Sequence, residues 1–160
     1  MTTTPLLTIE GEVAQPRSLT FADFAAIDAR FQIVDVSKID PKRAGDAVKL
    51  EGLLQLVGVK PSGKWLTLHA SLDDFHASIP LDAVRDRGIV IYRVQGEPLP
   101  QKAGGPIRFY IPDFAACHTT DIDECANVKF VDRIEFTAER QFDNRPHDGE
   151  EHEELHRKQS

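Results

Sequence analysis

The apolar residues of the chain follow two periods, which together predict a mixture of helix and strand. In segment 50–57 they recur at i, i+3, i+4 and i+7, which is the spacing of one buried face of an α-helix. Gly58 follows directly, so we expect the helix to end there. A second, shorter helix is predicted within SLTFADFAAI (18–27), with Ser18 or Thr20 as its N-cap.

Most of the other apolar segments alternate with polar residues or are rich in β-branched residues, which is typical of strands. These segments are PLLTIEGEV (5–13), RFQIVDV (30–36), WLTLHA (65–70), FHASIPL (75–81), GIVIYRV (88–94), PIRFYI (106–111) and VKFVDRIEFT (128–137). Strand segments outnumber helical ones. We therefore expect an α+β fold that is mostly β, with a few short helices.

Length and charge narrow the class of protein. A chain of 160 residues with 41% hydrophobic residues is large enough for one domain with its own core. Because hydrophobic periodicity stops near Arg140, we expect a domain over residues 1–140 and a polar, acidic, His-containing tail over 141–160. The net charge of −7 disfavours nucleic acid and anionic membranes as partners. The first residues lack the basic and apolar regions of a secretory signal, so we expect a cytoplasmic protein.

The tail contains HEELH at positions 152–156, which matches the zinc-protease pattern H-E-x-x-H. On a helix, two histidines four residues apart share a face, but a catalytic zinc also needs a third ligand and a rigid, shaped site. Leu155 is the only aliphatic residue after Phe142, so a helix here would have no apolar face to pack on a core. We interpret the motif as part of a solvated tail.

Four segments in order resemble a known family, the molybdopterin-binding domain of the sulfite oxidase family of oxidoreductases. They are LLTIEGEVAQPRSLTFADF (6–24), VKLEGLLQLVGVKP (48–61), QGEPLPQKAGGPIRFYIP (95–112) and VKFVDRIEF (128–136). The most specific part is GEPLP followed by GGPIRFYIP, which is similar to the family's G-E-P-L-P…G-x-P-x-R-x-x-x-P. The resemblance implies a compact, mostly β domain that holds molybdenum through the dithiolene of a pterin cofactor and through one protein cysteine.

The resemblance places that cysteine directly after the segment that here reads FQIVDV. Ser37 and Lys38 follow instead, and no cysteine occurs before position 117. A thiolate is a soft, anionic ligand, whereas a Ser hydroxyl stays protonated near neutral pH and binds such metals poorly. We therefore expect a non-catalytic or altered binding module that retains a pocket for molybdopterin or another small anionic ligand.

The resemblance also suggests which residues would contact a cofactor: Ser37, Lys38, Arg43, Arg108 and Lys129. The planar guanidinium of Arg108 is suited to a phosphate group; the alternative is an ordinary strand arginine paired with a carboxylate such as Glu97. The cations of the loop after Ser37 could form an anion pocket or simply be solvated.

The segment after IRFYIP is longer and more polar than the resemblance implies, and it holds Cys117, His118 and Cys125. Cys and His are suitable ligands for zinc or iron, so these three residues are a candidate metal or redox site. The alternative is a buried cysteine and a surface histidine without a ligand role. Two further functions therefore stay open: an active molybdopterin oxidoreductase that uses Cys117 or Cys125, and a Cys/His metal-binding or interaction protein.

The segment HASLDDFHAS (69–78) occupies the place of an Asp-Gly-aromatic turn in the family. Asp73, Asp74 and Phe75 hold the similar positions. His69 ends an apolar strand pattern, and we interpret it as a hydrogen-bonded structural residue rather than a metal ligand.

Overall fold

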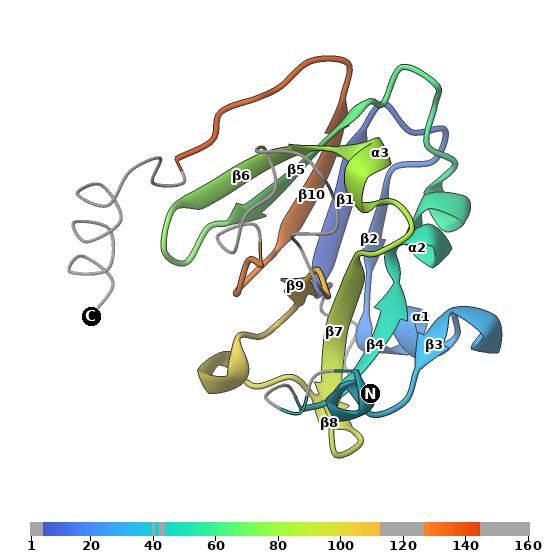
Figure 1. The fold of residues 1–160 in the computed structure, drawn as a ribbon, viewed down its shortest axis with the longest axis vertical. Helices are drawn as coiled ribbons and strands as arrows, with labels where there is room; N and C mark the ends of the chain where they lie inside the picture. The colour runs from blue at the N-terminus through green and yellow to red at the C-terminus, as the bar shows by residue number, and fades with distance from the viewer. Residues whose placement is uncertain (1–4, 40, 42–43, 113–126, 145–160) are drawn as a thin grey trace.

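The computed structural model describes residues 5–39, 41, 44–112 and 127–144, and this part of the chain folds into two sheets with short helices beside them (Figure 1). The first is a five-stranded sheet in the order β2-β1-β10-β5-β6. Its strands are β1 (Leu7–Gly11), β2 (Arg17–Leu19), β5 (Trp65–Ala70), β6 (Phe75–Pro80) and β10 (Arg133–Thr137).

The second sheet has the order β3-β4-β7-β8, and β9 pairs with β7. Its strands are β3 (Gln32–Ile33), β4 (Asp46–Lys49), β7 (Ile89–Val94), β8 (Glu97–Pro98) and β9 (Arg108–Tyr110). The helices are α1 (Phe21–Ala25), α2 (Leu50–Val57) and α3 (Leu81–Val84), with 3₁₀ turns η1 (Ala29–Phe31), η2 (Val36–Lys38) and η3 (Gln101–Ala103). The predicted fold class is confirmed, because strands predominate and the helices are short.

Both predicted helices are present. Helix α2 ends at Gly58, which adopts a left-handed φ of 67°, a conformation that glycine accepts readily. Helix α1 begins after Thr20, where the Asp23 N–H donates to the Thr20 hydroxyl and the Thr20 N–H donates to the Asp23 carboxylate. This second bond, from the Thr20 backbone, lowers the pKa of Asp23. Ser18, the other predicted N-cap, lies in β2.

The two ends of the domain meet in the first sheet. Strand β1 pairs in parallel with β10, with Thr8 opposite Arg133 (Figure 1). The Arg133 guanidinium lies 2.6 Å from the Glu10 carboxylate on the neighbouring strand. Strand β1, near the start of the chain, therefore lies at the centre of the sheet beside β10, the last described strand.

The buried apolar residues form two clusters. The larger one joins the first sheet to α1, α2 and β7, and its largest members include Phe24, Tyr92, Phe109 and Phe136. The smaller one joins η2 to the second sheet and to the segment after β8; it comprises Val36, Ala47, Ile89, Ile91, Leu99 and Tyr110. This second cluster matters for function, because it ties the Ser37 turn to the segment that contains GEPLP.

The strand predicted over residues 30–36 is shorter than expected. Only Gln32–Ile33 forms β3. Asp35 then adopts a left-handed φ of 69° and its side chain caps η2, so the backbone leaves the extended conformation.

The described chain continues to pack after β10. Residues 141–144 lie along β6, where the Asn144 N–H donates to the His76 carbonyl oxygen at 3.0 Å. The HEELH motif lies outside the described residues. No helix in the described part is long and apolar enough to span a membrane.

Candidate functional site

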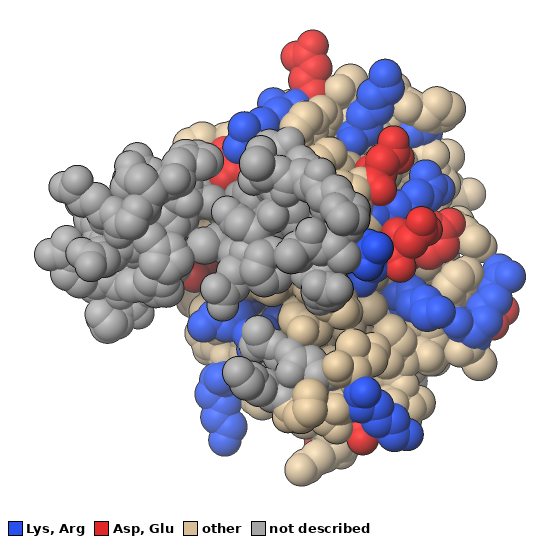
Figure 2. Space-filling model, viewed as in Figure 1, with Lys and Arg blue, Asp and Glu red and all other residues tan. Residues whose placement is uncertain are grey.

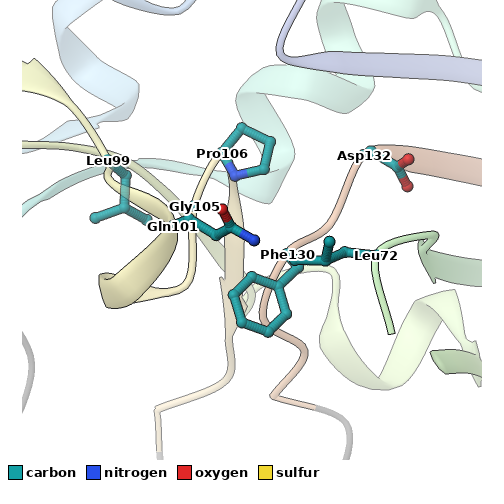
Figure 3. Close-up of a pocket in the computed structure, with 7 residues that line it drawn as sticks. All are labelled: Leu72, Leu99, Gln101, Gly105, Pro106, Phe130 and Asp132. Carbon is teal, nitrogen blue, oxygen red and sulfur yellow. The ribbon is translucent and has the colours of Figure 1, made fainter. Parts of the chain in front are cut away.

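A cavity of about 420 Å³ opens between three segments that are far apart in the sequence. They are the β5–β6 turn, the segment from β8 to β9, and the residues before β10. Its lining residues are Leu72, Leu99, Gln101, Gly105, Pro106, Phe130 and Asp132 (Figure 3). The volume lies within the range of small-molecule sites, and an apolar lining with a few polar groups is typical of them.

Two adjacent glycines shape the wall of this cavity. A Cβ at Gly105 would lie 1.9 Å from the Leu99 carbonyl oxygen, so only glycine fits there. Gly104 has a left-handed φ of 101°, and its carbonyl oxygen accepts a hydrogen bond from the Phe130 N–H at 2.8 Å. Gly104 and Gly105 thus let the chain turn so that η3 lies against the segment before β10.

The side chains of Arg108 and Lys129 converge on Gly104. A Cβ at Gly104 would lie 3.2 Å from Arg108 Cδ and 3.2 Å from Lys129 Cγ. The Arg108 guanidinium donates to the Ala103 carbonyl oxygen at 3.5 Å. On the face drawn in Figure 2, basic side chains gather over η3, beside the cavity segments. The structure therefore brings together two of the predicted cofactor contacts at Gly104, which is the direct neighbour of the lining residue Gly105.

Asp73 adds an acceptor beside the cavity, because it directly follows Leu72 of the lining. Its Oδ1 is buried and has no hydrogen-bond partner in the described part of the chain. Burial raises the pKa of the Asp73 carboxyl, and nearby Lys129 opposes that rise. The DDF segment indicated a turn here, but the burial of one oxygen depends on tertiary packing.

Ser37 lies in η2, at the edge of the smaller apolar cluster. Both its hydroxyl and its backbone N–H donate to Asp35 Oδ1, and the hydroxyl bond is the main cause of the lowered pKa of Asp35. Its neighbour Val36 is fully buried in the cluster that contains Leu99 of the cavity wall. Ser37 itself is not among the described residues that line the cavity, and Lys38 is exposed.

The other predicted site residues, Arg43, Cys117, His118 and Cys125, lie outside the described residues. Among the residues that are described, no cluster of three or more His, Cys, Asp or Glu side chains is placed to hold a metal ion. The structure thus groups Ser37 with Lys38 and Arg108 with Lys129.

Comparison with known proteins defines the class. The family model of the oxidoreductase molybdopterin binding domain matches residues 46–144, and the chain belongs to this family. The fold is similar to that in the crystal structure of the sulfane dehydrogenase SoxCD from Paracoccus pantotrophus, with a TM-score of 0.60 and 24% sequence identity. That similarity covers 85% of this chain and 39% of the SoxCD chain. No curated protein matches the sequence.

These comparisons confirm the resemblance found in the sequence. The protein is a molybdopterin-binding, oxidoreductase-type domain related to the sulfite oxidase family, and its mostly β fold is that of the family. The cofactor of this family is a pterin. The chain spans well under half of the solved chain that it resembles.

Proposed function

We propose that this domain is a molybdopterin-binding module in which Arg108 and Lys129 hold the anionic end of the cofactor, and that Ser37 does not serve as a molybdenum ligand. The observation that carries the proposal is the convergence of the two cations on Gly104, beside the cavity of about 420 Å³. Guanidinium and ammonium groups are the side chains best suited to a phosphate. Lys38, which directly follows Ser37, would add a further cation.

The described residues fit the pterin part of the cofactor. Phe130, Leu99 and Pro106 give the cavity an apolar lining against which a flat ring can pack. Asp73 offers a buried carboxylate oxygen without a partner in the described part of the chain, and a pterin carries amino and ring N–H donors that would satisfy it. Burial of such an acceptor is costly without a ligand.

The Ser37 turn does not fit a molybdenum ion in the same way. The Ser37 hydroxyl donates to the Asp35 carboxylate, so its proton is held by a neighbouring negative charge, which opposes formation of an anionic ligand. A neutral hydroxyl also lacks the softness of a thiolate. When bound with its metal, molybdopterin supplies redox chemistry; the residues of this chain supply binding and orientation.

The test is the pterin content of protein expressed in a host that makes molybdopterin, measured after oxidation to a fluorescent pterin. We expect about one pterin per wild-type chain. Arg108→Ala and Lys129→Ala each remove a charge-assisted contact of about 1.5 to 3 kcal/mol, which is roughly ten- to hundredfold in affinity. Arg30→Ala, at an exposed arginine of η1, is the matched control.

Two results would overturn the proposal: wild-type protein without pterin, or Lys129→Ala protein that retains as much pterin as Arg30→Ala. The Lys129 variant keeps the test decisive if Arg108→Ala fails to fold, because Lys129 is exposed.

A further inference from the structure

Four titratable side chains form a continuous row across the first sheet, from β10 to the β5–β6 turn. His69 Nε2 lies 3.2 Å from Glu135 Oε1, His69 Nδ1 lies 2.8 Å from His76 Nδ1, and His76 Nε2 lies 2.8 Å from Asp74 Oδ1. The histidines face each other in register on β5 and β6. His69 is buried and hydrogen-bonded, as the sequence predicted.

The number of ring protons decides whether this row holds together. Each ionised carboxylate needs an N–H at Nε2 of the histidine beside it, and the central contact needs one N–H between the two Nδ1 atoms. The three contacts therefore require three protons, whereas two neutral imidazoles carry two. With two protons, both at the Nε2 atoms, the lone pairs of the two Nδ1 atoms face each other at 2.8 Å. With four protons, two Nδ1–H groups face each other instead. The row is complete only when the histidine pair carries one additional proton.

Each described element that contacts the histidine pair carries charged side chains. They are Glu135 and Arg133 of β10, Asp73 and Asp74 of the β5–β6 turn, and Asp143 and Arg140 of the segment after β10. The hydrogen bond from Glu135 favours the protonated form of His69. Burial lowers the pKa of His69, and Arg133 also lowers it, so a second proton on the pair is opposed.

The histidine pair contacts a segment that lies along the edge of β6 with which no other described strand pairs. This segment, residues 141–144, is called the strap. Asn144 Oδ1 accepts from the His76 N–H at 2.8 Å, and Asp143 Oδ2 accepts from the Ser78 N–H at 2.9 Å. Strand β6 is the last strand in the order of its sheet, and unsatisfied edge donors favour pairing with another chain. The strap therefore satisfies two donors that the sheet leaves open.

Two residues of the strap, Phe142 and Asn144, contact His76. The Phe142 ring packs edge-on against the His76 ring, with centroids 5.3 Å apart. The Asn144 backbone N–H donates to the His76 carbonyl oxygen at 3.0 Å, and its side-chain amide donates to the Asp74 carbonyl oxygen at 2.7 Å. A movement of the His76 ring would disturb the strap directly at Phe142. It would also disturb the Asp74 side chain that the ring contacts, and the Asp74 carbonyl oxygen binds Asn144.

We propose that the proton shared by His69 and His76 makes binding of the strap to the edge of β6 depend on pH. With one shared proton, the row is complete and the strap docks. When that proton leaves, the two rings separate and the strap detaches, which exposes the His76 and Ser78 N–H groups. Docking weakens as the pH rises from about 5 to about 8, through the range in which histidines titrate, and again when a second proton enters under more acid conditions. This pH-dependent binding of the strap does not require a bound cofactor.

Amide hydrogen exchange at residues 76, 78 and 144 tests this proposal, after correction for the intrinsic effect of pH. We expect protection to fall at least tenfold between pH 5 and pH 8 in wild type, while Ile9 and Ile134 in the β1–β10 pair stay unchanged. In His76→Gln, which cannot share a proton, we expect low protection at both pH values.

Nitrogen NMR of the histidine rings in wild type provides a second measurement that needs no variant. We expect the two rings to take up one proton together over this range. Independent uptake of one proton by each ring, or equal strap protection at pH 5 and pH 8, would overturn the proposal.

Discussion

The hydroxyl and the backbone N–H of Ser37 donate to the same carboxylate oxygen, Oδ1 of Asp35. Asp35 is itself held by its N–H, which donates to Asp46 Oδ1 at 2.8 Å, and Asp46 binds Arg93 at 2.8 Å. The turn at which the family resemblance implies a metal-bound thiolate is thus a self-contained hydrogen-bonded unit. It needs no metal ion to keep its shape.

Gly104→Ala should reduce pterin binding more than its effect on stability explains. A Cβ there would lie 3.2 Å from both Arg108 and Lys129, so these two cations would move away from Gly104. Gly96→Ala is the matched control, because Gly96 also has a positive φ, of 79°, and its Cβ would meet no atom within 4 Å. Both variants should unfold at lower temperature, since alanine disfavours this backbone conformation, but only Gly104→Ala should lose pterin several-fold. Equal pterin in the two variants would contradict this role.

Asp73→Asn should stabilise the cofactor-free domain at neutral pH. Burial raises the pKa of Asp73 above its ordinary value of 3.8, so the charged form is less favourable in the folded chain than in the unfolded one. This destabilising effect appears as the pH rises from 3.8 through the raised folded-state value, and it is fully present above that value. Denaturation of cofactor-free protein at pH 7 and near pH 4 measures it: the gain should be present at pH 7 and shrink on acidification. Asp86→Asn, at an exposed site, should show no such trend.

Leu54→Ala should destabilise the domain by about 2 to 5 kcal/mol, because it leaves a cavity in the main core. Leu54 is 3% exposed in α2, whereas its neighbour Gln55 is exposed. Gln55→Ala should change the free energy of unfolding by no more than about 0.5 kcal/mol. Urea denaturation of the two variants compares the two faces of the helix, and a Leu54→Ala midpoint equal to that of wild type would mean that this face is not in the core.

The helices and strands that a pattern of neighbouring residues determines could be predicted from the sequence. Segment 50–57 carries both a helical apolar face and a terminal glycine, and it forms α2 as expected. The alternating segment 65–70 forms β5. The parallel pairing of β1 with β10 could not be predicted in this way, since it joins residues such as Thr8 and Arg133, and no local pattern specifies a partner that distant.

The site was predictable in part. Arg108 was found because it lies within the GGPIRFYIP segment, the most specific part of the family resemblance. The turn that Asp35 caps at Ser37 was missed, since a strand was predicted there. The D-V-S sequence permits the turn: an Asp side chain that accepts from the N–H two residues later interrupts a strand. The burial of the Asp73 Oδ1 atom depends on tertiary packing, which the sequence does not encode locally.

The ratio of molybdenum to pterin in freshly purified wild-type protein tests the central claim most directly. We expect about one pterin per chain with molybdenum well below one, because Ser37 supplies neither charge nor a soft donor. Ser37→Cys should raise the molybdenum content when the cofactor is available. Stoichiometric molybdenum in the wild-type protein would contradict the account; the ligand would then be sought at Cys117 and Cys125, by Cys→Ala substitution at each.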